Sequence, residues 1–116
     1  MNLQKISDSL HLKPLTVGPD LKQFEVQSGY CSDLLSCVMT GAGQGGVWVT
    51  LMAHGNIVAV ASLLDLSAII ITENAQPEPE TVKKAEEQNI PILSTPMTNF
   101  EVVGRSWELG LRQHQE

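Results

Sequence analysis

The chain has 116 residues, of which 42% are hydrophobic and 4% aromatic, which predicts one domain with a core packed mainly by aliphatic side chains. Its 13 acidic residues against 7 Lys and Arg give a net charge of −6, which repels phosphate backbones and anionic lipids, so we expect no nucleic-acid and no membrane partner. We also expect a cytoplasmic location, because the sequence lacks a membrane-spanning apolar run and a secretion signal.

The N-terminal third is predicted to be irregular. We expect helices at Leu3–Leu10 and Ser32–Thr40, and short strands at Lys13–Val17 and Phe24–Gln27. Ser32 or Ser28 is the expected cap of the second helix, whose apolar residues Leu34, Leu35, Val38 and Met39 lie on one side. Asp33, just inside that helix start, is expected to favour the helix dipole.

From residue 47 onward, strand and helix patterns alternate. Strands are predicted at Val47–Leu51, Ala68–Thr72 and Ile90–Ser94, and helices at Glu78–Gln88 and Asn99–Arg112. The segment Ile57–Leu66 fits a helix better than a hairpin strand. Strands joined by crossover helices indicate an α/β fold, with a Rossmann-like, mostly parallel sheet of about five strands flanked by helices.

The last predicted helix carries four apolar residues at helical spacing: Phe100, Val103, Trp107 and Leu111. We expect this face to pack against the core. The alternative is that it forms a docking face for another protein, since a large exposed apolar patch usually marks an interaction surface.

Ligands of open parallel sheets bind beyond the carboxyl ends of the strands. Three loops are predicted at that edge, and the candidate ligand-binding residues in them are His54, Gly55, Asn56, Thr72, Glu73, Ser94, Thr95 and Thr98. They could cradle a small anion at helix N-termini. Two alternatives stay open: Asn56, Thr95 and Thr98 are ordinary helix caps, and His54 is a solvated loop residue.

Other motifs carry little chemistry. The glycine-rich segment Gly41–Gly46 precedes a strand, so it is predicted to be a connector at the opposite edge of the sheet and not a phosphate loop. Cys31 and Cys37 are expected to be small buried hydrophobes. They are too few for a metal or iron–sulfur site, so no cofactor is expected. With no assembled catalytic constellation, we expect that the chain is not an enzyme.

Several strings together resemble the DRTGG domain family over residues 12–111. They are Gly29–Met39, Trp48–Thr50, His54–Ala61, Ala68–Thr72, Ile90–Ile92 and Thr98–Glu101. The resemblance implies an α/β domain similar to the N-terminal domain of HPr kinase. It also implies a regulatory role, because DRTGG domains occur joined to paired CBS domains in pyrophosphatases and within phosphate acetyltransferases. By analogy with those pyrophosphatases it implies a homodimer.

The chain departs from the family where the family name originates. An Asp-Arg-Thr-Gly-Gly pentapeptide is absent, and the loop where relatives often carry a Gly-Asp-Arg sequence reads Ala53-His54-Gly55-Asn56. A ligand contact by that arginine is therefore not carried over. Two hypotheses follow: a regulatory, ligand-sensing homodimer that binds a small anionic, nucleotide-like ligand, or an accessory subunit that contacts a partner protein such as a hydrogenase or other redox complex.

Overall fold

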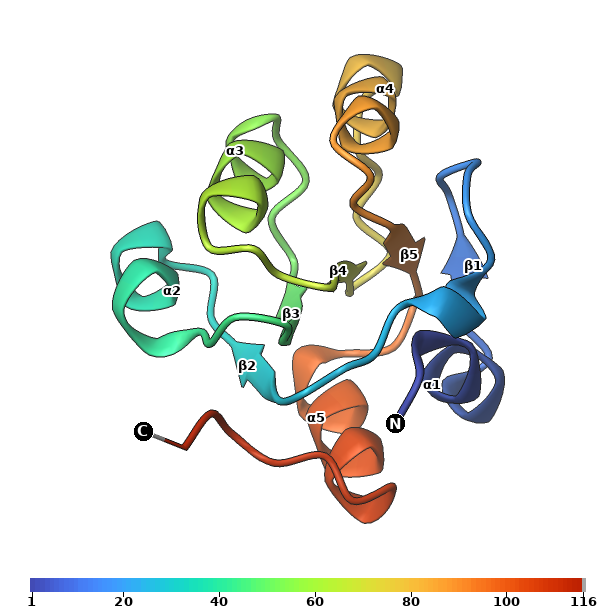
Figure 1. The fold of residues 1–116 in the computed structure, drawn as a ribbon, viewed down its shortest axis with the longest axis vertical. Coiled ribbons are helices and arrows are strands. Elements are labelled where there is room, and N and C mark those ends of the chain that lie inside the picture. Colours follow the sequence, from blue (N-terminus) through green and yellow to red (C-terminus); the bar gives the residue numbers. More distant parts are fainter. Residues whose placement is uncertain (116) are drawn as a thin grey trace.

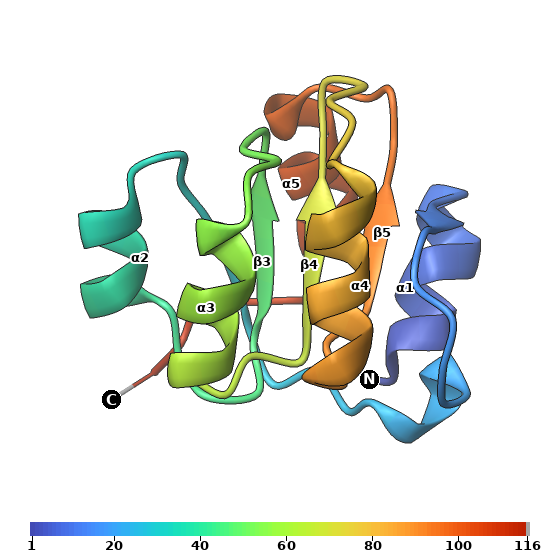
Figure 2. The same cartoon turned by 90° about the horizontal axis from the view of Figure 1, so that it is seen from above.

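The computed structural model describes residues 1–115 and contains a five-stranded sheet with helices on both faces (Figures 1 and 2). The strand order is β1-β5-β4-β3-β2. The parallel strands are β2 (Gly29–Cys31), β3 (Val47–Thr50), β4 (Ala68–Ile71) and β5 (Ile92–Ser94). The short β1 (Lys13–Pro14) runs antiparallel to β5 at one edge. The predicted α/β class with a mostly parallel sheet is confirmed.

The helices form two layers, which Figure 1 shows with the strands seen end-on. One face is covered by α1 (Leu3–Leu10) and α5 (Asn99–Glu108), and the other by α2 (Leu35–Gly41), α3 (Asn56–Leu63) and α4 (Pro79–Glu87). A 3-10 turn, η1 (Leu21–Gln23), precedes β2. None of the helices in residues 1–115 is both long enough and apolar enough to cross a membrane.

The central strands supply both cores. Successive side chains of a strand point to opposite faces, so Val49 and Ile70 join α1 and α5, whereas Trp48 and Ile69 join α2, α3 and α4. All residues of β3 and β4 are buried. This double burial explains why the sequence of β4 is a continuous apolar run without alternation.

Most element boundaries follow from local signals. The helix predicted within Ile57–Leu66 is confirmed as α3. Pro79 begins α4, and Asn89, with a φ of 59°, ends it in the left-handed conformation that Asn tolerates. Thr98 caps α5, with its hydroxyl accepting from the Glu101 amide at 3.2 Å.

Three predictions in the N-terminal third are wrong: one strand, one helix start with its cap, and the apolar side of that helix. The predicted strand Phe24–Gln27 is an extended segment along the amino edge of the sheet, and the second strand is Gly29–Cys31. The next helix begins at Leu35, because the Ser32 hydroxyl accepts from the Leu34 amide at 3.1 Å and forms a turn there. Ser28 is buried and caps no helix, and the expected apolar side of α2 is buried only at Val38.

The predicted core face of α5 is also wrong. Phe100 is 91% exposed, Trp107 53% and Val103 40%, whereas Val102 and Ser106 face the core. Ser106 is a small polar residue on the buried side of α5. A prediction based on the number of apolar residues therefore selected the wrong face of the helix. Leu111 is buried, but it lies beyond the helix end.

The two-sided burial of β4 predicts a large effect of truncation there. Replacement Ile70→Ala removes a side chain with no exposed area and is expected to lower the free energy of unfolding by about 2–5 kcal/mol. Urea unfolding followed by circular dichroism measures it. Val17→Ala, at an 83% exposed position, is the control and should change stability by less than about 0.5 kcal/mol. Equal effects of the two changes would contradict the assignment of Ile70 to the core.

Candidate functional site

The carboxyl ends of β3, β4 and β5 meet at one edge of the sheet, toward which the arrows point in Figure 2. The three predicted loops follow these strands, so the structure brings them to the same edge. They differ in how many of their polar groups are already bonded within the chain. That difference decides which loop is free to bind a ligand.

The second and third loops are bonded to each other. The Glu73 amide donates to the Met97 carbonyl at 2.8 Å, and the Asn74 amide donates to the Thr95 carbonyl at 3.1 Å. Glu73 and Asn74 both have a φ of 58°, so the turn after β4 uses the left-handed conformation twice. These amides are occupied and leave no anion cradle between the two loops.

The side chains of these loops also have partners. The Thr95 hydroxyl accepts from the Met97 amide at 3.2 Å, and a Glu73 carboxylate oxygen accepts from the Asn99 amide at 3.1 Å. Thr98 caps α5, as the alternative interpretation held. Ser94 is buried in β5 beside β1. A role of these residues in ligand binding stays a prediction, but their observed contacts are structural.

A hydrogen-bond network that the sequence did not reveal is centred on Asp33. One oxygen of its carboxylate accepts from the Thr50 hydroxyl and the Leu51 amide, each at 2.8 Å. The other oxygen accepts from the Asn99 side-chain amide at 3.1 Å, and the Asn99 side-chain oxygen accepts from the Thr72 hydroxyl. Asp33 thus joins β3 to α5, and Asn99 extends the link to β4. The expected dipole role is wrong, because α2 begins two residues later.

The first loop is different, because its backbone donors are free. Within residues 1–115, the amides of Gly55 and Asn56 at the start of α3 have no acceptor. A Cβ atom placed on Gly55 would lie 3.8 Å from Lys84 Nζ and 3.9 Å from the Thr81 hydroxyl. Asn56 does not cap α3, and the side chains of His54 and Asn56 are exposed.

Lys84 is the residue of this site that sequence reasoning missed. It lies in the last turn of α4, far along the chain from Gly55. In the described part of the chain it forms no ion pair. The first loop therefore combines two free amides, a helix N-terminus, the hydroxyl of Thr81 and an unpaired ammonium.

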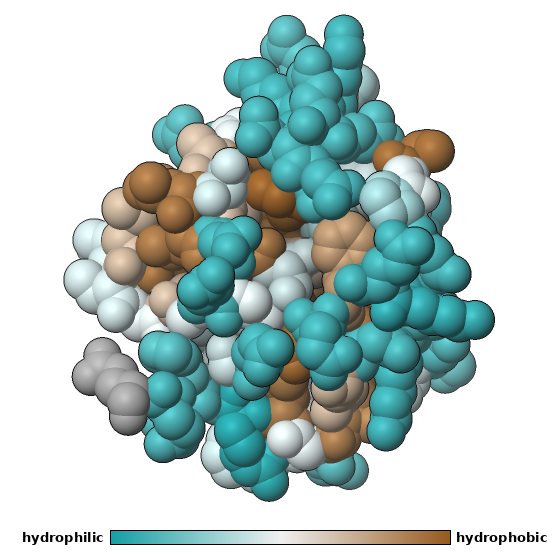
Figure 3. Space-filling model, viewed as in Figure 1, coloured by the Kyte–Doolittle hydropathy of each residue, from teal (hydrophilic) through white to brown (hydrophobic). Residues whose placement is uncertain are grey.

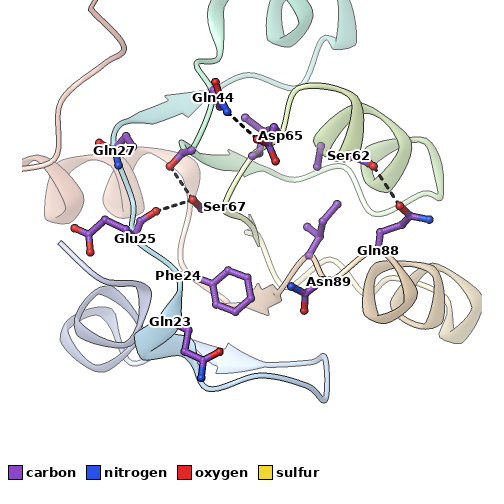
Figure 4. A pocket seen from close by; sticks show the side chains of 14 residues that line it. Gln23, Phe24, Glu25, Gln27, Gln44, Ser62, Asp65, Ser67, Gln88 and Asn89 are labelled. Carbon is purple, nitrogen blue, oxygen red and sulfur yellow. Dashed lines mark hydrogen bonds between the residues drawn. The ribbon is translucent and has the colours of Figure 1, made fainter.

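A cavity lies at the opposite, amino edge of the sheet (Figure 4). Its volume is about 620 Å³, and Gln44 and Gly45 of the glycine-rich connector line it, as that segment's predicted position requires. Gln44 donates to Asp65 at 2.9 Å across its rim (Figure 4). Its wall includes Glu25 and Asp65 but no Lys or Arg, so it is poorly suited to an anion.

The cysteines carry no assembled site. Cys37 is exposed, so its predicted burial is wrong, whereas Cys31 is partly buried. Burial, and secondarily the charge of Asp33, raises the pKa of the Cys31 thiol. Among residues 1–115, no group of three or more His, Cys, Asp or Glu side chains is placed to hold a metal ion.

Comparison with known proteins defines the class of this α/β chain. The DRTGG domain model matches residues 36–106, and the chain belongs to the DRTGG domain family. The resemblance found in the sequence is thereby confirmed. DRTGG domains are regulatory and non-catalytic, which agrees with the expectation that this chain is not an enzyme. No curated protein sequence matches the chain.

A solved structure shares the fold. It is the crystal structure of the CBS and DRTGG domains of the regulatory region of Clostridium perfringens pyrophosphatase, complexed with its activator diadenosine tetraphosphate. The TM-score is 0.66 at 17% sequence identity, over 89% of this chain and 44% of that chain. The present chain thus spans less than half of the matched chain.

The Asp33 network predicts a stability effect from an exposed residue. Asp33→Ala removes the acceptor of the buried Thr50 hydroxyl and two further hydrogen bonds, so we expect a loss of about 1–3 kcal/mol of unfolding free energy. Thermal and urea unfolding measure it. The control Asp8→Ala, at an exposed position, removes only a hydrogen bond from the Gln4 side chain and should be nearly neutral. A neutral Asp33→Ala would show that the network does not contribute to stability.

Proposed function

We propose that the chain is a regulatory domain that binds a small anionic ligand at the start of α3 and acts as a homodimer. The single observation that carries the binding proposal is the position of Lys84 Nζ beside the free amides of Gly55 and Asn56. The predictions that residues 1–116 form one domain and that the protein is cytoplasmic are part of the same proposal.

The charges around the start of α3 favour an anion there more than at the other two loops of the same sheet edge. The N-terminus of α3 carries the positive end of a helix dipole, and unpaired amides point from it. The Lys84 ammonium adds a full positive charge. Asp33 and Glu73 place negative charge at the neighbouring loops, so the anion would sit toward α3 and α4, away from α5.

A phosphate group is the first chemistry to test. It has several acceptor oxygens for the two amides, the ammonium and the Thr81 hydroxyl. The activator in the pyrophosphatase complex, diadenosine tetraphosphate, is a polyphosphate of that chemical type. His54, exposed beside Gly55, could contact a nucleoside attached to the phosphate.

Thermal unfolding with inorganic phosphate, ATP and diadenosine tetraphosphate tests this site. A ligand present at about 100 times its dissociation constant adds roughly 2.7 kcal/mol of stability, which raises the unfolding midpoint by roughly 10 °C in a domain of this size. We expect Lys84→Gln to abolish the shift, and Lys83→Gln, at the neighbouring exposed position, to retain it. No shift with any of the three compounds, or equal shifts in both variants, would refute the site.

The dimer proposal rests on the outer face of α5. Phe100, Val103 and Trp107 are exposed there, and Gly104 lies among them with nothing within 4 Å of the position a Cβ would occupy. Glycine inside a helix lowers the stability of the helix by about 1 kcal/mol relative to alanine. No atom within the chain lies close enough to Gly104 to exclude a larger side chain. A partner backbone that approaches closely would explain its presence.

A second copy of the chain fits this face. Phe100 projects one helical turn from the open surface at Gly104, so in an antiparallel two-fold crossing each Phe100 can lie over Gly104 of the other copy. The same crossing brings Glu101 of one copy toward Arg105 of the other. These two residues form an ion pair of 2.7 Å within one helix. In the proposed dimer they would also pair with the opposite charges of the second copy across the two-fold axis.

A partner protein is the second candidate, and a different surface favours it. Exposed Leu34, Met39 and Leu63 belong to or border α2 and α3, and Figure 3 shows apolar side chains gathered over these helices, whereas α4 is covered by hydrophilic ones. A patch of this kind is typical of an interaction surface. It agrees with the accessory-subunit hypothesis.

Replacement of Gly104 by leucine distinguishes these surfaces. Because the space around Gly104 is open, Gly104→Leu should leave the fold of one copy intact but block close approach of a second. Sedimentation equilibrium should show a dimer for the native chain and at least tenfold weaker association for the variant. The control is Gly18→Leu, at an equally open glycine far from α5. A native monomer, or an unaffected dimer in Gly104→Leu, would contradict the α5 interface.

A further inference from the structure

A second, smaller cavity lies between β2 and α5. Its volume is about 240 Å³, and its wall includes Tyr30, Val49, Val103, Ser106, Trp107 and Arg112. It is separate from the proposed anion site, which is formed by α3 and α4 on the other face of the sheet. Pockets for drug-sized ligands usually measure about 300–1,000 Å³, so this cavity suits a smaller, single-ring molecule.

The wall of this cavity contains the sole buried side-chain polar atom without a hydrogen-bond partner in residues 1–115. It is the hydroxyl oxygen of Ser106, a residue only 5% exposed. Buried polar groups are nearly always paired, since an unpaired one loses its hydration without compensation. The hydroxyl oxygen is enclosed in this conformation, but Ser106 lines the cavity, so a change of its side-chain rotamer would let a bound molecule supply the missing partner.

The remaining wall is mostly apolar. Val49, Val103 and Leu111 contribute aliphatic surface, and Trp107 contributes an aromatic ring. Cys31 also lines the cavity, and burial raises the pKa of its thiol, so this side chain is neutral at physiological pH. An apolar ring is therefore the body of the ligand that this wall accepts.

Arg112 supplies the charge at the edge of the cavity. Its guanidinium lies 3.9 Å from the centroid of the Trp107 ring, and its Nη1 donates to the Trp107 and Leu111 carbonyls, each at 2.9 Å. These contacts hold the side chain in place. Within the described chain the Arg112 guanidinium has no carboxylate partner. Its remaining N–H donors can therefore bind the carboxylate of a ligand.

We propose that the cavity between β2 and α5 binds a small aromatic carboxylate that carries a second polar group. The ring lies against the apolar wall, the carboxylate pairs with the Arg112 guanidinium, and the second polar group bonds to the Ser106 hydroxyl. A hydroxybenzoate is the simplest compound of this class. The proposal stands independently of the anion site at Lys84.

Titration with four compounds tests it: 4-hydroxybenzoate, 3-hydroxybenzoate, benzoate and 4-hydroxybenzamide. Amide resonances of β2 and α5 in ¹H–¹⁵N NMR spectra report binding at this cavity. At least one hydroxybenzoate should bind saturably and more tightly than benzoate. Arg112→Gln should weaken hydroxybenzoate binding at least tenfold and leave the uncharged benzamide unchanged. The control Arg105→Gln, at an exposed arginine on α5, should change the binding of neither compound.

Ser106→Ala separates the hydroxyl from the charge. It should weaken binding of the hydroxybenzoate several-fold and leave benzoate binding unchanged, with an unaltered circular dichroism spectrum. Gly104→Leu should retain binding, which distinguishes this site from the proposed dimer face. Absence of saturable shifts with all four compounds would overturn the proposal. Chemical-shift changes confined to elements other than β2 and α5 would overturn it as well. So would an equal loss of affinity for hydroxybenzoate and for benzoate in Ser106→Ala.

Discussion

The placement of α5 depends on the hydrogen bonds around Asn99, its first residue. The Asn99 side chain bonds to Asp33 beyond β2 and to Thr72 after β4, and its backbone amide bonds to Glu73. Together with the Thr98 cap, these contacts fix where the helix begins and how it is rotated. The rotation turns Ser106 toward the sheet and Phe100 toward solvent. Both the cavity beside β2 and the exposed apolar face follow from it.

The elements that the sequence predicted well are those dominated by local signals. β4 is an unbroken run of β-branched residues buried on both sides, and α4 is bounded by Pro79 and Asn89. In these segments propensity, pattern and capping agree, so few alternatives compete. The error at residues 24–27 has the opposite origin. Their contacts are made with distant backbone groups such as the Gly45 carbonyl, which no local pattern reveals.

The candidate site was predictable in outline only. Strand order places the three loops at one edge, and that much follows from the alternation of strands and helices. Which loop keeps free donors depends on pairing between loops, as with Glu73 and Met97, and on the reach of Lys84 from another helix. Likewise the partners of Asp33 come from β3 and α5. Such contacts join residues far apart in sequence and leave no periodic trace.

The edges of the sheet limit how copies of this protein can pack together. β1 has two residues and β2 has three, and the Gly29 amide on β2 is already bonded to the Arg112 carbonyl of the C-terminal segment. Short, partly covered edges offer few free backbone groups for a strand of another molecule, which protects against open-ended sheet growth. The proposed self-association would therefore use side chains on the helices. Two-fold contacts of that kind close into discrete dimers.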